Sequence, residues 1–363
     1  MSDNKNYSSE SILQKRIKSF KKIKRGYFAL IFLGGLYLLS FLNPILVNNK
    51  ALVVNYNGEY SFPAFSELFS PILGESYYDG KDFGQAEGTP HYRSLKQKYK
   101  QEGQGNWVLM PFYPYGPYET LLREFPEGVK PPTAPDTKNF FGTDTQGRDI
   151  FARTMYGFQI SISFALIVTF LSYMLGIIIG ALLGYYGGRV DLYGVRLIEI
   201  FSTIPFLFTL IILVKYIRPS FLLLAAMYVV LKGWIGISYY VRGEFYREKN
   251  RDYVAAGIAM GQNDFKIMFK HILPNALTSV ITFAPFAIIG YISALVSLDF
   301  LGFGLPVPTP SWGELIQQGS QNITYWWLIV TPLFMMFFTL SMITFIGEAV
   351  RQAFDPRIYS RLQ

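Results

Sequence analysis

The sequence predicts an all-α polytopic membrane protein with six transmembrane helices and an extracytoplasmic insertion between the first two. Hydrophobic residues make up 51% of the 363 residues and charged residues only 16%, which is too apolar for a soluble domain. Six apolar segments each have roughly the 20 residues that a helix needs to cross the hydrocarbon core. Lys and Arg gather in alternate connections, as they do on the cytoplasmic side of membranes.

The first span is predicted at residues 27–47, behind a basic cytoplasmic tail at residues 1–26. The apolar run is longer than the hydrophobic region of a typical signal peptide. No small-residue cleavage site follows Asn43 and Pro44. We therefore expect an uncleaved span whose N-terminus lies in the cytoplasm.

Residues 48–139 are rich in aromatic, Gly, Pro and charged residues and contain no run long enough to span a membrane. We predict that they form an extracytoplasmic insertion. Its aromatic side chains have three alternative roles: a recognition surface, the small core of the insertion, or contacts at the lipid interface. They are Tyr56, Tyr60, Phe62, Phe65, Tyr77, Tyr78, Trp107, Phe112, Tyr113, Tyr115 and Tyr118.

Residues 140–157 are predicted to form an interfacial amphipathic helix that leads into the second span. Thr143 and Gln146 have the spacing of a capping box. Two charge pairs at i, i+4 would support an exposed helical face. They are Asp144 with Arg148 and Asp149 with Arg153.

The transmembrane domain is predicted at residues 158–350, with spans at 159–184, 192–214, 220–242, 276–298 and 326–350. Counting from a cytoplasmic N-terminus places loop 243–275 and the tail 351–363 in the cytoplasm. The loop carries five basic residues that agree with this topology: Arg247, Lys249, Arg251, Lys266 and Lys270.

Small residues and prolines mark the interior of the predicted spans. Gly176, Gly180 and Gly184 form a ladder that allows another helix to approach closely. Pro205 and Pro285 predict kinks or local unwinding.

Three charged residues are candidates for the translocation path, because charges at membrane depth are often functional: Glu199, Lys232 and Asp299. Each also has a simpler explanation. Glu199 has Arg196 three residues before it as an ion-pair partner. Lys232 can extend toward the membrane surface or face a cavity, and Asp299 can lie at the outer boundary.

Several classes of chemistry are excluded or disfavoured. The chain has no cysteine, which excludes disulfides, thiolate nucleophiles and Cys-based metal sites. It has two histidines and no G-x-x-x-x-G-K-[ST] phosphate loop. We expect no catalytic residues, no metal and no bound cofactor. Cytoplasmic loops account for the net charge of +8, so nucleic acid is not an expected partner.

The predicted cytoplasmic segment from Asp252 to Pro274 has residues suited to close contact with another protein. Ala255, Ala256 and Gly257 are too small to keep a partner at a distance. Gly261 stands where a helix would end in a left-handed residue. Asn263 or Asp264 can cap a second helix, which Pro274 would end. The alternative is an ordinary amphipathic loop between two spans.

The same segment resembles the EAA loop of ABC-importer permeases, whose pattern is E-A-A-x-x-x-G, nine residues, then I-x-L-P. Ala256, Gly261, Leu273 and Pro274 match this pattern. Ala255 replaces the Glu of the family, Gly257 replaces its second Ala, and His271 replaces its Ile. The resemblance implies that residues 243–275 contain a coupling helix for an ATP-binding subunit, with Asp252 and Tyr253 at its start. The missing Glu removes one expected salt bridge to that subunit.

Further motifs extend the resemblance over residues 140–356, to the C-type permeases of dipeptide and oligopeptide importers and most of all to the YejE type. They are FGTDTQGRDIFART, GYYGGRVD, SLDFLGFGLP, PSWGEL and IGEAVRQAFDP. The resemblance implies a type-1 permease fold in the bacterial inner membrane, forming half of a translocation path for peptides or peptide-like compounds.

The resemblance also implies a set of partners. These are a second permease, two ATP-binding subunits or one fused ATPase, and an extracytoplasmic substrate-binding protein. ATP would then be used by those subunits and not by this chain. Two alternatives stay open: the same architecture importing nickel chelates or another small solute, and a channel or scaffold outside the ABC class.

Overall fold

The computed structural model describes residues 12–66 and 78–354 of the chain. The chain divides into two compact units. The first comprises residues 1–34, 163–294 and 338–363, and the second comprises residues 35–162 and 295–337. The ends of both predicted tails, residues 1–11 and 355–363, lie outside the described residues, as does Tyr77 of the insertion.

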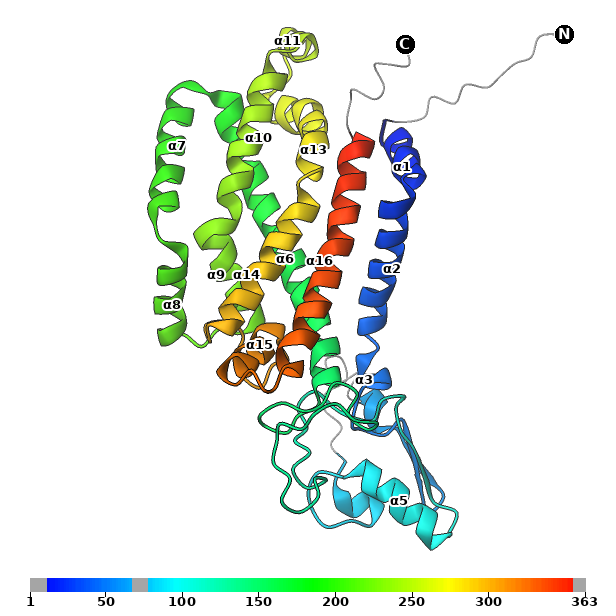
Figure 1. Cartoon of the computed structure of the whole chain (residues 1–363). Helices are drawn as coiled ribbons and strands as arrows, with labels where there is room; N and C mark the ends of the chain where they lie inside the picture. The colour runs from blue at the N-terminus through cyan, green and yellow to red at the C-terminus, as the bar shows by residue number, and fades with distance from the viewer. Residues whose placement is uncertain (1–11, 67–77, 355–363) are drawn as a thin grey trace, which may run out of the picture. The chain divides into compact units, whose positions relative to one another are not determined.

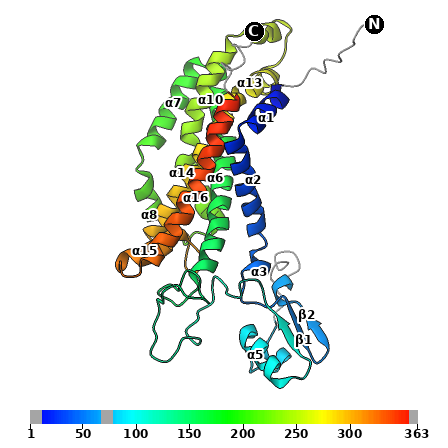
Figure 2. The ribbon, with the colours of Figure 1, turned by 45° about the vertical axis from the view of Figure 1, so that its right-hand side comes forward.

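The first unit is a bundle of apolar helices (Figures 1 and 2). The helices α6 (Ile150–Tyr186), α10 (Trp234–Lys249) and α13 (Leu273–Ile281) share one buried core, which includes Ala181, Val241 and Ala276. Four helices pass from one unit into the other: α2 (Lys24–Ser40), α6 (Ile150–Tyr186), α14 (Ala284–Phe300) and α16 (Trp327–Phe354). The first unit also holds α1 (Ile12–Lys22), α7 (Gly188–Thr203), α8 (Phe206–Tyr216), α9 (Phe221–Tyr228), α10 (Trp234–Lys249), α11 (Asp252–Ala259), α12 (Asp264–Lys266) and α13 (Leu273–Ile281).

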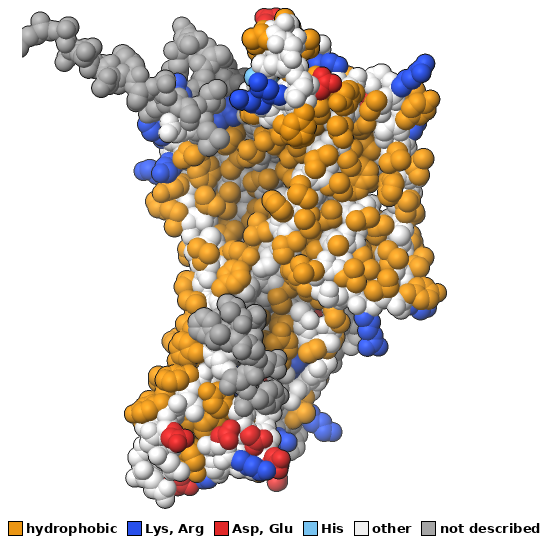
Figure 3. Space-filling view, turned by 180° about the vertical axis from the view of Figure 1, so that it is seen from behind, with side chains coloured by type: hydrophobic (Ala, Val, Ile, Leu, Met, Phe, Trp, Pro, Cys, Tyr) orange, Lys and Arg blue, Asp and Glu red, His pale blue; other side chains and the backbone are white. Residues whose placement is uncertain are grey.

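The helices have the length and composition of membrane spans. Within the described residues, three helical stretches are long and apolar enough to cross a bilayer: Ile150–Tyr186, Phe221–Lys249 and Trp327–Phe354. Two bent helix pairs raise the number to five if each pair counts as one span. Figure 3 shows hydrophobic side chains spread over the helical part of the face in view, with Lys, Arg, Asp and Glu side chains at the margins of this area. The predicted helical membrane protein is confirmed.

The first predicted span ends earlier than expected. α2 stops at Ser40, and residues 43–46 form a separate short helix, α3 (Asn43–Leu46), with Pro44 in its first turn. Proline has no N–H to continue a preceding helix but fits the first turn of a new one. Part of the predicted basic tail is also helical, because α1 covers Ile12–Lys22 and meets α2 at a bend of 96°.

Both predicted kinks are present. α7 and α8 meet at a bend of 69°, and Pro205 is the N-cap residue directly before α8. The predicted helix 276–298 is interrupted at residues 282–283, between α13 and α14 and just before Pro285. Proline cannot donate to the carbonyl four residues earlier, so a continuous helix is disfavoured at both places.

The predicted insertion is a folded part of the second unit. Strands β1 (Val53–Tyr56), β2 (Glu59–Ser61) and β3 (Trp107–Leu109) form an antiparallel sheet in the order β2-β1-β3. One face of this sheet packs against α5 (Tyr92–Glu102) and a 3₁₀ turn at Gly80–Phe83 (Figure 2). The unit also contains α15 (Trp312–Gln321).

The aromatic residues of the insertion divide between its core and its surface. Tyr113 and Tyr115 are buried, and Tyr56 stacks on Tyr99 at 5.7 Å between ring centroids. Other aromatic side chains remain exposed: Tyr60, Phe62, Trp107, Phe112 and Tyr118. The small-core alternative therefore describes one part of this set, and these five side chains lie at the surface.

Candidate functional site

The candidate site is the segment that runs from the end of α10 into the first turn of α13, residues 250–274, which we call the coupling segment. α10 ends at Lys249, and α11 begins at Asp252 after a two-residue turn. α12, a π-helical stretch at Ile267–Ile272 and α13 follow without a gap. Two helical stretches therefore meet at a corner around Gly261, as the sequence predicts.

The backbone conformation at the corner requires glycine. Gly261 has φ of +71°, in the left-handed region that a Cβ disfavours. The Gln262 amide donates to the Gly257 carbonyl at 3.2 Å, which is the six-to-one bond of a Schellman motif. The predicted left-handed helix end is confirmed.

The second helix begins as predicted but does not end where predicted. The Asn263 side chain accepts a hydrogen bond of 2.9 Å from the Lys266 amide and so caps the helix. Pro274 does not end the helix: it lies in the first turn of α13, which continues to Ile281. The π-helical turn just before it widens the helix at the place where the proline lacks an N–H.

The coupling segment has one buried side and one exposed side. Val254, Ile267, Met268 and Ile272 are buried in the core shared with α6 and α10. Gly257 is buried as well. The exposed side includes two small residues and three large apolar ones that we call the coupling surface: Ala255, Ala256, Ile258, Met260 and Phe265.

The remaining predicted coupling residues lie at the two ends of the segment. Asp252 is exposed in the first turn of α11, where a carboxylate favours the helix N-terminus. Tyr253 donates a hydrogen bond of 2.9 Å to Glu248, and burial raises the pKa of Tyr253. Leu273 is half-buried, and Pro274 is exposed.

The glycine ladder of α6 lies against α10. A Cβ on Gly176 would come within 1.9 Å of Ile237, and one on Gly180 within 2.5 Å of the Ser238 carbonyl. A Cβ on Gly184 would lie 2.5 Å from Phe245. The two helix backbones approach so closely at these places that no larger residue fits.

The structure gives each charged path candidate a local partner. Glu199 forms an exposed ion pair of 2.6 Å with Arg196. Lys232 lies in the π-helical turn Val229–Gly233, with its ammonium 5.4 Å from the Phe206 ring centroid. Asp299 is buried and accepts hydrogen bonds from the Leu305 amide and the Ser311 hydroxyl. These contacts do not unite the three into one site.

The segment before α6 differs from the predicted interfacial helix. The helix begins only at Ile150, and residues 140–149 form a compact turn. Asp149 accepts from the Ala152 amide at 2.8 Å, as an N-cap residue does. Thr143 makes no capping box, because its hydroxyl bonds to Thr133.

The charged side chains of this turn are buried. The prediction that they form an exposed helical face is therefore wrong. Asp144 and Arg148 form the predicted pair, but Asp149 bonds to Tyr113 and Asn139 instead of Arg153. Burial raises the pKa of Asp149. The carboxylate of Glu314 on α15 binds both arginines, Arg148 at 2.8 Å and Arg153. Such long-range pairing leaves no signal in local spacing.

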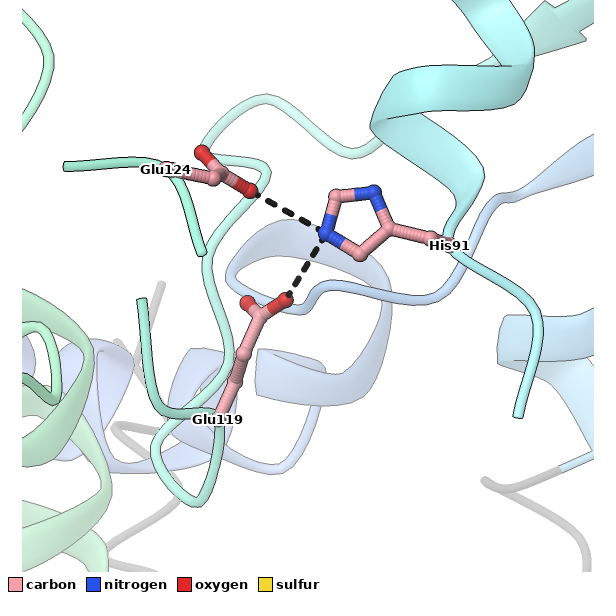
Figure 4. Close-up of side chains that lie close together, drawn as sticks. All are labelled: His91, Glu119 and Glu124. Carbon is pink, nitrogen blue, oxygen red and sulfur yellow. Dashed lines mark ion pairs between the residues drawn. The ribbon is translucent and has the colours of Figure 1, made fainter. Parts of the chain in front are cut away.

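Among the residues that the structure describes, one group has donors placed for a metal ion: His91, Glu119 and Glu124 (Figure 4). The Arg93 guanidinium already binds both carboxylates, at 2.7 and 2.5 Å. His91 Nδ1 accepts from the Ser94 amide, so the proton of a neutral ring lies on Nε2, 3.1 Å from Glu124. The group therefore fits an ion-pair network better than a metal site.

Comparison with known proteins agrees with the motifs. Residues 176–360 match the family model of the binding-protein-dependent transport system inner membrane component. The chain is 40% identical over 343 residues to the inner membrane ABC transporter permease protein YejE of Escherichia coli, covering 94% of this chain and 96% of that protein. It is 37% identical over 354 residues to the peptidoglycan transport system permease protein YejE of Agrobacterium fabrum, covering 95% and 93%.

A third relative, the oligopeptide transport system permease protein OppC of Haemophilus influenzae, is 38% identical over 221 residues, covering 60% of this chain and 70% of that protein. These matches confirm the resemblance to ABC peptide permeases and the prediction of a transport component. The chain belongs to the family of binding-protein-dependent transport system inner membrane components.

Proposed function

We propose that the chain is the membrane-spanning permease subunit of an ATP-driven importer and forms half of the path for peptides or peptide-like compounds. It crosses the bacterial inner membrane six times, with both termini in the cytoplasm and residues 48–139 outside. In this topology α2, α6, the bent pair α7 and α8, the stretch from α9 to α10, the pair α13 and α14, and α16 are the spans.

The coupling surface is the observation that carries this proposal. Met260 and Phe265 are each 69% exposed, on a segment whose other side is anchored in the core. Exposed apolar patches on an ordered surface mark sites of protein interaction. The small Ala255 and Ala256 beside them permit close approach of a partner backbone. We assign an ATP-binding subunit to this surface, and motion of that subunit would tilt the attached spans.

The names of the relatives support the proposed cargo. One relative is named for oligopeptide transport and another for peptidoglycan transport. Both cargoes contain peptide bonds, which a path for peptides or peptide-like compounds would recognise. The proposed partners are a second permease, two ATP-binding subunits or one fused ATPase, and an extracytoplasmic binding protein. No cofactor or metal is proposed for this chain.

Reconstitution with the partner subunits tests the proposal. The complete complex in proteoliposomes should accumulate a labelled tripeptide only when ATP and the binding protein are both supplied. Met260→Asp should abolish uptake and weaken retention of the ATP-binding subunit, because a carboxylate would replace an apolar contact. Phe112→Asp, at a residue 89% exposed in the second unit, is the control and should transport normally. Wild-type complex that shows no ATP-dependent peptide uptake would refute the proposed function.

A further inference from the structure

The connection between α6 and α7 is a tight corner close to the coupling segment. α6 ends at Tyr186 and α7 begins at Gly188, so one residue separates the two helices. Gly187 and Gly188 have φ of +64° and +52°, which only glycine adopts readily. We call residues 185–191 the α6–α7 corner. Its shortness means that a displacement of the corner reaches both α6 and α7.

Asp191 ties the corner to α10. Its two carboxylate oxygens accept hydrogen bonds from two nitrogens of the Arg242 guanidinium, one of them at 2.6 Å. The Tyr246 hydroxyl donates to the same carboxylate at 2.7 Å. Bidentate arginine pairs fix orientation as well as distance. α10 continues from these residues directly into the coupling segment.

Tyr185 ties the same corner to the coupling segment itself. Its hydroxyl donates a hydrogen bond of 2.7 Å to Asp264, the first residue of α12. The carbonyl of Tyr185 accepts from the Lys249 ammonium. The Tyr185 ring is buried in one core with Val254 and Ile267 of the coupling segment. The corner is therefore in contact both with the end of α10 and with the coupling segment that follows it.

We propose that a movement of the coupling segment is transmitted to α7 through the α6–α7 corner, and that Asp191 is the positioning residue for this transmission. This inference rests on the proposed function, because it concerns how ATP use is coupled to transport. Packing of apolar side chains permits sliding, whereas the bidentate pair to Arg242 and the Tyr185 bond to Asp264 hold discrete positions. Without the pair between Asp191 and Arg242, the ATP-binding subunit would stay attached, but α7 would no longer move together with the coupling segment.

The test measures the number of cargo molecules moved per ATP hydrolysed by the reconstituted complete complex. Asp191→Asn keeps the side-chain shape but removes the charge that holds Arg242. We expect ATP hydrolysis and subunit retention to stay near wild type, while cargo per ATP falls about fivefold or more. Asp191→Glu, which can pair again with Arg242, should recover most of the ratio.

The matched control is Arg247→Gln on the same helix. Arg247 pairs with Glu244 and Glu248, so this change breaks ion pairs within α10 and leaves the corner intact. It should keep the wild-type ratio. If Asp191→Asn lowers hydrolysis and transport in equal proportion, or changes neither, the inference is overturned. If the wild-type complex itself shows no ATP-dependent transport, the proposed function fails instead.

Discussion

Arg148 donates from Nε to the Asp144 carboxylate at 2.7 Å, and both side chains are almost completely buried. A buried ion pair stabilises little compared with a well-packed apolar pair, but breaking it leaves an uncompensated charge. We predict that Asp144→Ala lowers the free energy of unfolding by about 3–5 kcal/mol.

Thermal unfolding of the purified chain in detergent measures this effect. The control is Lys81→Gln, which breaks an ion pair with Glu87 in which both side chains are more than half exposed. It should cost less than about 1 kcal/mol. Equal shifts in Tm for the two variants would show that the buried network does not hold the second unit together.

We predict that replacing glycine by alanine changes the free energy of unfolding in opposite directions at two positions, Gly180 on α6 and Gly236 on α10. In Gly180→Ala, the new Cβ would lie 2.5 Å from the Ser238 carbonyl, so α6 and α10 must separate. This should cost about 1–3 kcal/mol. Gly236→Ala on α10 meets no atom within 4 Å and should stabilise the helix by up to about 1 kcal/mol. Unfolding of both variants in detergent checks the contrast, and equal effects would argue against close packing at Gly180.

We predict that a larger residue at Gly261 is disfavoured by the backbone conformation there and not by a clash with neighbouring atoms. A Cβ at Gly261 would meet no atom within 4 Å, so the cost comes from its positive φ. A left-handed residue with a Cβ costs roughly 1–2 kcal/mol, and Asn tolerates that region better than most residues. We predict that Gly261→Leu loses peptide uptake while the protein still inserts, and that Gly261→Asn keeps a substantial part. Normal uptake by the Leu variant would show that coupling does not need this corner.

The insertion should lose stability in acid through Glu124. The hydrogen bond from His91, helped by Arg93, lowers the pKa of Glu124 from 4.5 to about 2. A carboxyl whose pKa is lower in the folded than in the unfolded chain stabilises the fold above the unfolded value. That contribution is lost as the pH falls from about 4.5 toward 2. The Tm of the wild-type chain should therefore fall more steeply over this range than that of Glu124→Gln. Parallel curves would contradict the assigned pKa.

Local sequence signals predicted the coupling segment well. The Gly261 corner and the Asn263 cap depend on residues within a few positions of each other, and both are present in the structure. Pro205 and Pro285 likewise interrupt helices by chemistry that each carries alone. Pro274 was misjudged as a helix end because its effect depends on the widened turn before it.

Features that depend on distant partners were not predictable from one sequence. Arg148 and Arg153 have the spacing of an exposed helical face, yet both are buried because Glu314 reaches them from α15. Asp191 stands in a recognisable motif, but its pairing with Arg242 joins residues 51 positions apart. Periodicity reports neighbours along a helix, and it carries no record of which helix lies opposite.

The most direct measurement is a cross-link from the coupling surface to the ATP-binding subunit. The chain has no native cysteine, so Ala256→Cys provides a single exposed thiol. In a complex that transports peptide, a short reagent with a maleimide at one end for this thiol and an amine-reactive succinimidyl ester at the other should join Ala256→Cys to lysines of the ATP-binding subunit, and Phe112→Cys should form no such product. Absence of the Ala256 cross-link at every stage of the ATP cycle, in a complex that still transports, would contradict the assignment of residues 250–274 as the coupling segment.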